Sequence, residues 1–258
     1  MQSGQYIVDR MMVQMVRDIC DERGITLQTF SDDWLMELEM NDQTARILGY
    51  KFGLNESAAS SIAQDKVAAS QLLNYHKVAA VPHFLIRTKA NEANWKSRQW
   101  TDGMVIKPLT GTSGHGVCRF ETVQKAEAWM AEQGIEAWAV SPYFDIAREI
   151  RLIMLDQNVL LCYEKRPAIV DGFKWFNLGK GAIPVDYVPT KRQLTLAIEA
   201  RQALGLRLAA IDIIELNSGE QMVLEVNDGI MMENYARISD ENRATTKVVY
   251  TSIIDEML

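Results

Sequence analysis

The chain has 258 residues, of which 48% are apolar, with a formal net charge of -7 at pH 7 and a pI near 5.1. This apolar content is enough to build the core of one large domain or of two closely packed lobes. The acidic balance argues against a general nucleic-acid binder, because a phosphate backbone requires a basic face. Any anionic ligand must therefore meet local positive charge.

The three cysteines, Cys20, Cys118 and Cys162, lie far apart and form no CxxC pair, which predicts neither a disulfide framework nor a zinc site. The first residues lack the basic and apolar segments of a secretory signal. No apolar run approaches the roughly 18 residues needed to span a bilayer. A soluble protein in a reducing, cytoplasmic compartment is expected, with no membrane partner.

The first third of the chain predicts two helices and a strand. Apolar residues at helical spacing indicate a helix over 5–23 with a methionine-rich core stripe, and Gly24 is its expected C-cap. A short strand over 25–30 follows, and a single helix is predicted over 57–78. Residues 1–61 are expected to form a small N-terminal lobe.

From residue 104 onward, strands and helices alternate. Strands are predicted over 104–107, 116–120 and 137–140, helices over 122–133 and 191–204, and a final helix toward the C-terminus; hairpins are predicted over 149–166 and 209–227. Thr190 and Gly205 are suitable caps for the helix between them. Antiparallel strands mixed with flanking helices predict an α+β fold, with further lobes over 62–140 and 141–258.

The hairpin over 209–227 places oxygen-bearing side chains in two runs that otherwise resemble buried strands. A turn at 217–220 sets Asp212 opposite Glu225, and alternation along the strand places Asn227 on the same face. Burying unpaired carboxylates is costly, so a divalent cation is the simplest compensation, and hard oxygen donors favour magnesium or manganese. The alternative is a hairpin whose carboxylates face solvent.

The hairpin over 149–166 carries alternating charges. A two-residue turn at 157–158 sets Arg151 opposite Glu164 and Glu149 opposite Arg166, so that both cross-strand pairs are complementary. A slip by one residue would keep only one ion pair, and the first register is therefore predicted. The remaining positions, which are apolar, are expected to face the core, and a solvated charged face is the alternative.

Residues 104–120, MVIKPLTGTSGHGVCRF, join a strand ending at Lys107 to a glycine-rich loop. The loop contains Gly111, Thr112, Ser113, Gly114, His115 and Gly116. Glycines let backbone N–H groups approach an anion, and hydroxyl side chains add donors. This is no Walker motif, because the lysine precedes the loop and a strand follows it. The segment favours a nucleotide-binding loop over an ordinary hairpin turn, and His115 either contacts phosphate or faces solvent.

Several separated motifs together resemble the ATP-grasp ligases, in particular the RimK-like branch of glutathione synthetases and ribosomal-protein glutamate ligases. They cover about residues 62–235 in family order and read DKVAASQLL, VIKPLTGTSGHGV, VSPYF, REIRLI, YEKRP, FNLGKGA, IDIIE and LEVND. The resemblance implies an ATP molecule clamped between two α+β lobes, with the glycine-rich hairpin over the triphosphate.

The resemblance also implies roles for individual residues. Lys66 and Lys107 match phosphate-contacting lysines, Ser141 the acceptor from the adenine amino group, and Glu149 the ribose-binding carboxylate. The implied nucleotide site comprises Lys66, Lys107, Gly111, Thr112, Ser113, Gly114, Gly116, Ser141, Pro142, Tyr143, Phe144 and Glu149. The implied metal ligands are Asp212, Glu225 and Asn227, and the implied catalytic residues are Arg166, Lys174 and Asn177.

The implied reaction transfers the terminal phosphoryl group of ATP to a carboxylate, and an amine then attacks the acylphosphate. Magnesium and cationic side chains would neutralise the charge that develops. Some relatives carry an arginine at the position of Ala210, which leaves Arg166 as the candidate for stabilising the acylphosphate.

The substrates stay open among an amino acid, a peptide terminus and a natural-product precursor. The N-terminal lobe is shorter than the usual leading domain, so a dimer partner or the peptide substrate is expected to complete the cleft. An ATP-grasp phosphotransferase and a catalytically silent nucleotide-binding module are the alternative functions.

Overall fold

The computed structural model describes residues 9–87, 94–111, 114, 116–170 and 173–258. Its helices are α1 (Met11–Arg23), α2 (Ser57–Gln64), α3 (Lys66–Tyr75), α5 (Val123–Glu132), α6 (Lys191–Ala203), α7 (Glu233–Ala236), α8 (Asp240–Met257) and the 3₁₀ helix η1 (Leu178–Lys180). Its strands are β1 (Thr26–Phe30), β2 (Leu35–Met40), β3 (Gln43–Leu48), β4 (Lys51–Phe52), β5 (Phe84–Ile86), β6 (Met104–Pro108), β7 (Cys118–Phe120), β8 (Trp138–Pro142), β9 (Ile146–Leu155), β10 (Asn158–Arg166), β11 (Ala168–Val170), β12 (Phe173–Trp175), β13 (Ile183–Asp186), β14 (Leu208–Leu216) and β15 (Gln221–Asn227). The predicted α+β class is confirmed. Across the described ranges, no helix is long and apolar enough to cross a membrane.

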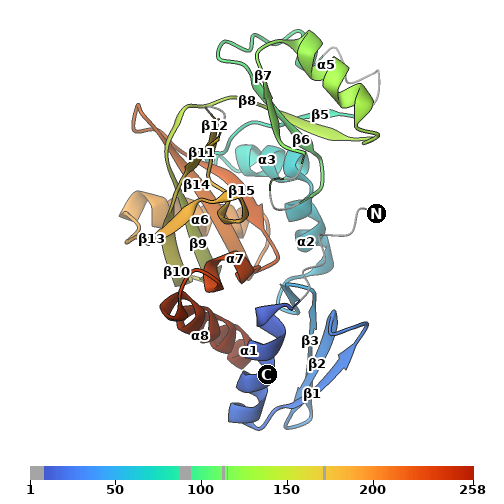
Figure 1. The fold of residues 1–258 in the computed structure, drawn as a ribbon, viewed down its shortest axis with the longest axis vertical. Helices are drawn as coiled ribbons and strands as arrows, with labels where there is room; N and C mark the ends of the chain where they lie inside the picture. Colours follow the sequence, from blue (N-terminus) through green and yellow to red (C-terminus); the bar gives the residue numbers. More distant parts are fainter. Residues whose placement is uncertain (1–8, 88–93, 112–113, 115, 171–172) are drawn as a thin grey trace.

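The molecule has three tiers (Figure 1). The upper tier is the sheet β5-β8-β6-β7 with α5, the middle tier is the sheet β13-β10-β9-β14-β15, and the lower tier contains β1-β2-β3-β4 with α1 and α8. Helix α3 lies between the upper and middle tiers (Figure 1). The chain thus presents two α+β layers that face each other across α3. The division into lobes at 61/62 and 140/141 remains a proposal.

Helix α1 is shorter than predicted. It begins at Met11 rather than at residue 5, and residues 5–8 lie outside the described residues; Gly24 ends it in the left-handed conformation, as predicted. The first amides of α1 are satisfied by Glu233 of α7, whose buried carboxylate accepts from the N–H groups of Met11 (3.0 Å) and Met12 (3.1 Å). The start of α1 is therefore fixed by a residue far along the chain.

The predicted methionine stripe is core. Met12, Met15, Val16 and Ile19 are buried, in a core that α1 shares with α8 and with one end of the middle sheet. Strands β2–β4 were not predicted, although the sequence LMELEM alternates as a half-buried strand does. The lower tier therefore shares its core with α8 and with one end of the middle sheet.

The helix predicted over 57–78 is two helices. Helix α2 ends at Gln64, and Asp65 adopts an extended backbone conformation. Its carboxylate accepts from the N–H groups of Val67 (3.0 Å) and Ala68 (2.9 Å), which is a helix N-cap. The break makes Lys66 the first residue of α3 and points it toward the cleft described below.

The register of the β9–β10 hairpin differs from the prediction. Glu149 is paired with Lys165, and Arg151 with Tyr163, which is the register that the sequence analysis rejected. The turn lies at Asp156 and Gln157 instead of 157–158, and Asp156 adopts a positive φ of 50°, which aspartate tolerates better than most residues. The prediction counted ion pairs between β9 and β10 only, whereas charged residues of β9 and β10 also pair with β14, which lies on the other side of β9.

The β14–β15 hairpin confirms the predicted pairing of Asp212 with Glu225. A β-bulge separates this pair from the turn, where the register is Glu215 with Gln221 instead of Leu216 with Gln221. The predicted register is therefore wrong beside the turn and right at the functional end of the strands.

The pattern along β9 decides where the middle sheet can bind a ligand. Ile150 and Leu152 face the core that contains α6, and Ile153 faces the core that contains α1 and α8. Glu149 and Arg151 lie on the same face as Ile153 but beyond that core. This charged half of the face borders the upper tier, where a cavity is left.

Candidate active site

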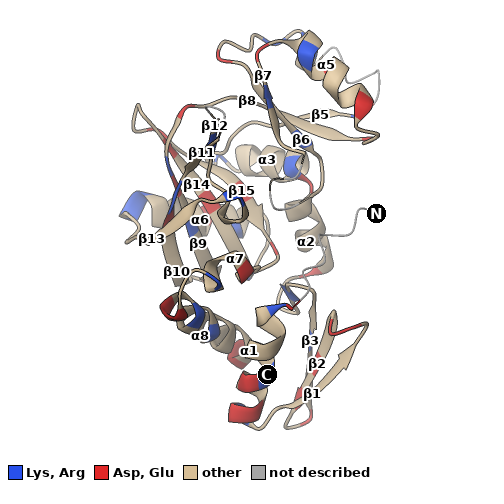
Figure 2. Ribbon diagram, viewed as in Figure 1, with Lys and Arg blue, Asp and Glu red and all other residues tan. Residues whose placement is uncertain are grey.

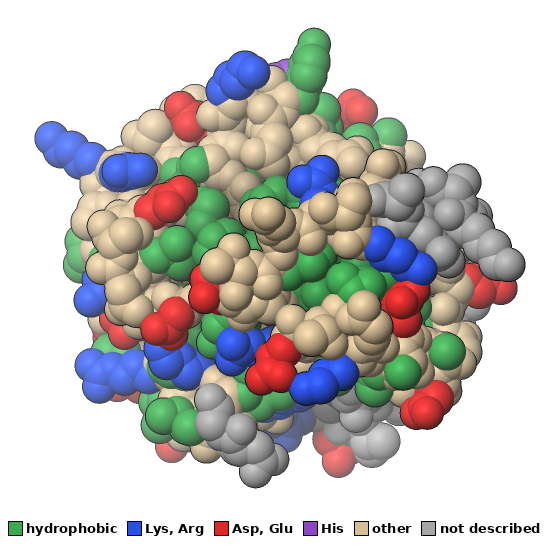
Figure 3. Space-filling view, turned by 90° about the horizontal axis from the view of Figure 1, so that it is seen from above, with side chains coloured by type: hydrophobic (Ala, Val, Ile, Leu, Met, Phe, Trp, Pro, Cys, Tyr) green, Lys and Arg blue, Asp and Glu red, His purple; other side chains and the backbone are tan. Residues whose placement is uncertain are grey.

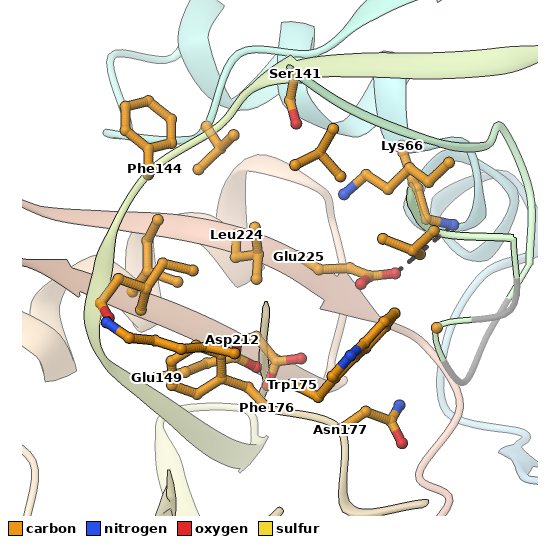
Figure 4. A pocket seen from close by; sticks show the side chains of 18 of the residues that line it. Lys66, Ser141, Phe144, Glu149, Trp175, Phe176, Asn177, Asp212, Leu224 and Glu225 are labelled. Atoms are coloured by element: carbon orange, nitrogen blue, oxygen red, sulfur yellow. Dashed lines mark hydrogen bonds and ion pairs between the residues drawn. The ribbon is translucent and has the colours of Figure 1, made fainter. Parts of the chain in front are cut away.

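A cavity of about 240 Å³ lies between the upper and middle sheets (Figure 4). Among the residues named from sequence, those that line it are Lys66, Lys107, Gly111, Gly114, Ser141, Pro142, Tyr143, Phe144, Glu149, Lys174, Asn177, Asp212, Glu225 and Asn227. Segments separated by more than a hundred residues thus converge on a single cleft.

One side of the cleft is apolar. Its wall is built by Val81, Val105, Ile146, Ile214 and Leu224, and Ser141 is buried beside it. The Tyr143 N–H already donates to the carbonyl of Gly103 (3.0 Å). A flat, mostly apolar ring with a polar edge, such as a purine, fits this part of the cleft.

Two lysines enter the cleft from the upper side. The Lys66 ammonium donates to the carbonyl of Gly111 (2.9 Å) and lies 3.8 Å from the carboxylate of Glu225. Lys107, on β6, is buried, and burial lowers its pKa to about 8, with the nearby charge of Glu225 opposing this shift. A bound polyanion would restore the charge of Lys107.

A buried network of four charges forms the floor. Arg151 donates to both oxygens of Asp212 (2.8 and 2.6 Å), and the Lys165 ammonium donates to Asp212 (2.8 Å) and to Glu149 (2.6 Å). Burial alone would raise the pKa of Asp212, but the charges and hydrogen bonds of Arg151 and Lys165 outweigh it and lower the pKa to about 2. Burial raises the pKa of Glu149, and the charge of Lys165 opposes that rise.

Asp212, for which a divalent cation was predicted, also has two cationic partners within the protein. Within the described ranges, the side chains that neutralise this carboxylate are Arg151 and Lys165, and no group of three or more His, Cys, Asp or Glu side chains is placed to hold a metal. The charges on both sides of Asp212 are part of the folded protein.

The donor set nevertheless fits magnesium as nucleotide sites use it. Magnesium in such sites takes one or two carboxylates and completes its shell with phosphates and water, without a cage made only of protein. Glu225 keeps its carboxylate in the cleft, with Lys66 no closer than 3.8 Å, and Asn227 follows on the same strand face. Asp212 retains one acceptor direction beyond its three hydrogen bonds.

Of the three catalytic residues named from sequence, two line the cleft and one does not. Arg166 is exposed and is not among the described lining residues, because it follows Lys165 on β10 and so faces the opposite side of the sheet. Lys174 lines the cleft, but its ammonium is bound to Asp145 (2.7 Å) and to the carbonyl of Ile146 (3.0 Å). Asn177 lines the cleft, and its carbonyl oxygen accepts from the Gly179 N–H.

The glycine-rich loop is only partly described. Gly111 and Gly114 line the cleft, while Gly116 does not and instead packs close to Pro108. Thr112, Ser113 and His115 lie outside the described residues.

Sequence reasoning missed Arg151 and Lys165 as cleft residues, and also the aromatic segment Phe173, Trp175 and Phe176. Alternation was a usable signal for the two cations, since Glu149 and Arg151 share a face. No local signal shows that β14 lies beside β9, so the carboxylate between the cations could not be identified.

Comparison with known proteins gives a consistent assignment. A family model described as "RimK-like ATP-grasp domain" matches residues 63–250. A probable alpha-L-glutamate ligase of Enterobacter sp. (strain 638) is 32% identical over 180 residues, which cover 68% of this chain and 59% of that protein. The ribosomal protein bS6--L-glutamate ligase of Escherichia coli O139:H28 is 29% identical over the same shares. The chain thus spans about 59% of the length of these curated relatives.

Solved structures agree on the fold. The D-alanine--D-alanine ligase of Bacillus anthracis has a TM-score of 0.59 at 16% identity, covering 79% of this chain and 70% of its own. The D-cycloserine synthetase DcsG has a TM-score of 0.59 at 19% identity, covering 77% of this chain and 71% of its own. At these identities the likeness concerns the fold alone. With more than half of its residues matched by the family model, the chain belongs to the RimK-like ATP-grasp family.

Proposed function

We propose that this protein is an ATP-dependent carboxylate–amine ligase that forms an amide or peptide bond and releases ADP and phosphate. The observation that carries the proposal is the convergence of Lys66, Lys107, Glu149, Asp212 and Glu225 on one cleft. A structure of the D-alanine--D-alanine ligase of Bacillus anthracis in complex with ATP has the same fold, with a TM-score of 0.58 at 16% identity. Cationic and acidic side chains in one cleft suit a nucleotide with its cation.

The adenine would occupy the apolar wall beside Ser141, with its edge toward the backbone at Pro142 and Phe144. Glu149 would accept from the ribose hydroxyls with the oxygen that Lys165 leaves free. Lys66 and Lys107 would hold the phosphates. Figure 4 shows Ser141 and Lys66 on the same side of the cleft, across from Trp175 and Asn177.

Glu225, Asn227 and Asp212 would hold magnesium, or manganese in its place. When bound, the cation supplies charge neutralisation for the transferred phosphoryl group. Arg151 and Lys165 keep Asp212 ionised and oriented, so that the chain presents this ligand in a fixed position.

The chemistry divides into two steps. A carboxylate oxygen of the substrate bonds to the γ-phosphorus of ATP while the bond from that phosphorus to the β-bridging oxygen breaks, and ADP leaves. An amine then attacks the carbonyl carbon, loses a proton, and expels phosphate. Both steps move negative charge, and fixed cations stabilise such steps without reorganisation.

The substrate class follows from relatives that are named glutamate ligases. We propose an amino acid such as L-glutamate as the amine and a peptide or small molecule as the carboxylate. A partner copy or the peptide itself would complete the cleft. Neither nucleic acid nor membrane is proposed as a partner. The protein would act in the cytoplasm, where its three unpaired cysteines, Cys20, Cys118 and Cys162, stay reduced.

The charge pattern on the face seen in Figure 3 does not favour a nucleic acid as a partner. On that face, among the residues that are described, Lys and Arg side chains are interspersed with Asp and Glu and form no continuous basic patch. Figure 2 shows acidic residues gathered on α1 and around β2 and β3, away from the cleft.

A hydroxylamine trap tests the proposal. Protein, Mg²⁺, ATP and candidate carboxylates are incubated with hydroxylamine, which attacks an acylphosphate and leaves a hydroxamate. Hydroxamate that requires ATP and carboxylate supports the ligase. ADP formation with a hydroxyl acceptor and no hydroxamate would show a phosphotransferase, and no ADP with any acceptor would show a silent nucleotide-binding module.

A further inference from the structure

Lys180 is a cation held by an aromatic ring at the rim of the cleft. It is the last residue of η1, it is exposed, and its ammonium lies 3.6 Å from the centre of the Trp175 ring. Phe173 supports that ring from the same hairpin, with the two ring centres 4.8 Å apart. In Figure 4 the Trp175 ring projects into the cleft near Glu225, across from Ser141. Lys180 thus lies against Trp175, which lines the cleft.

Two observations from the upper tier fix the same position. A Cβ atom placed on Gly114 would lie 3.8 Å from Cε of Lys180 and 4.0 Å from the Trp175 ring. Burial raises the pKa of the Cys118 thiol, and the positive charge of Lys180 opposes that rise. Lys180 therefore stands where the middle and upper tiers meet, although it belongs to the middle one.

The partner of Lys180 distinguishes it from three cations that line the cleft. Arg151, Lys165 and Lys174 each have a carboxylate within 2.8 Å. Within the described part of the chain, no carboxylate lies within 4.0 Å of the Lys180 ammonium, and its contact is an aromatic face. An aromatic face attracts and positions an ammonium but leaves its net charge uncancelled.

We propose that Lys180 binds the substrate carboxylate and so acts as its anchor, and that Trp175 positions the Lys180 ammonium for this contact. This inference rests on the proposed ligase function and gives a role to a residue that lies in the motif FNLGKGA but to which the resemblance assigned none. Lys180 would take the role of substrate-binding cation, for which Lys174 is not free because its ammonium is paired with Asp145.

Electrostatics supplies the reason for such an anchor. A carboxylate must approach the terminal phosphate of ATP, and two anions in a partly desolvated cleft repel each other. A lysine without a carboxylate partner offsets this repulsion and donates a charge-assisted hydrogen bond. The substrate class is accordingly one with a free carboxylate whose neighbouring group can lie against an indole face. The anchored carboxylate can be the one that is phosphorylated or a neighbour of it.

The test measures binding of a defined carboxylate without turnover. Tetra-L-glutamate with a free C-terminus is titrated calorimetrically into protein saturated with Mg²⁺ and a nonhydrolysable ATP analogue. Lys180→Gln should weaken peptide binding roughly 10- to 100-fold, the loss of one charge-assisted hydrogen bond, while affinity for the analogue stays unchanged. Lys180→Arg should recover most of the peptide affinity. Lys191→Gln, an exposed lysine of α6 with the same charge change, is the control and should bind as the wild type does.

The outcomes separate this inference from the proposed function. Equal peptide affinity in wild type and Lys180→Gln overturns the anchor, as does an absence of peptide binding to the wild type, even if the hydroxamate assay is positive. A selective loss in Lys180→Gln together with no hydroxamate supports the anchor and overturns the ligase. A parallel loss of analogue affinity would show that Lys180 serves the nucleotide, which also overturns the assignment.

Discussion

Nucleotide binding should take up a proton at Lys107. In the free protein, burial lowers the pKa of this lysine to about 8, so a growing fraction is neutral above that pH. A bound triphosphate favours the ammonium and should return the pKa to at least the usual value of about 10.4. The charged form binds, and raising the pH therefore opposes binding.

The magnitude follows from these two values. With pKa values of about 8 free and about 10.4 bound, proton uptake is about 0.1 at pH 7, about 0.5 at pH 8 and about 0.9 at pH 9. The dissociation constant of the nucleotide should rise about tenfold from pH 7 to pH 9, which is about 1.4 kcal/mol.

Calorimetry measures this uptake directly. A Mg²⁺–ATP analogue is titrated at pH 9 in two buffers of different ionisation enthalpy, and the difference in heat gives the protons bound. Lys107→Met removes the group and should abolish the uptake, whereas the exposed Lys125→Gln on α5 should retain it. Proton uptake that persists in Lys107→Met, or none in the wild type, would show that Lys107 does not take up a proton when the nucleotide binds.

Three further predictions concern the acidic residues. Glu225→Gln should abolish Mg²⁺-dependent ADP formation with little change in the urea midpoint, because Lys66 is its nearest charge, at 3.8 Å; wild-type turnover would remove Glu225 from the metal site. Asp212→Asn should lower the unfolding free energy by about 3–5 kcal/mol, since it leaves Arg151 and Lys165 without this carboxylate. An unchanged urea midpoint would show that these ion pairs do not stabilise the fold. The pKa of Asp212 in the folded protein is lowered to about 2, so the stability that its carboxylate contributes is present above about pH 4 and is lost as the pH falls through 2. Between pH 4 and pH 2, the unfolding free energy of Asp212→Asn should therefore fall less steeply with pH than that of the wild type. Glu233→Gln should lower the unfolding free energy by about 1–3 kcal/mol by weakening the cap of α1, with nucleotide affinity unchanged. The control Glu132→Gln, at an exposed position of α5, should change neither the unfolding free energy nor the nucleotide affinity.

Local pattern was sufficient where the deciding contact lies within one hairpin. The turn residues and the period of two predicted the pairing of Asp212 with Glu225, and Thr190 forms the capping box at the start of α6. The pairing holds because the β-bulge between Asp212 and Ile213 offsets the one-residue error beside the turn. The metal-ligand candidates were therefore brought to one face correctly.

Local pattern failed where a distant strand or residue decides. Counting ion pairs within β9 and β10 selected the wrong register, because Lys165 bridges Glu149 and Asp212, and the latter is on β14. Arg166 was named from the family resemblance, and the observed register instead places its neighbour Lys165 in the cleft. Asp65 was not predicted as a helix cap, because the helical pattern continues across it and the turn of the chain at this residue depends on tertiary contacts. Tertiary neighbours, rather than residue preferences, settled these positions.

The central claim is that a carboxylate is activated by direct phosphoryl transfer from ATP in this cleft. The most direct measurement uses tetra-L-glutamate whose carboxylates carry ¹⁸O, incubated with protein, Mg²⁺, ATP and L-glutamate as the amine, followed by mass analysis of the phosphate released. We expect one ¹⁸O atom in each phosphate formed together with the amide, because the carboxylate oxygen leaves with the phosphoryl group. Amide formation with unlabelled phosphate would contradict it.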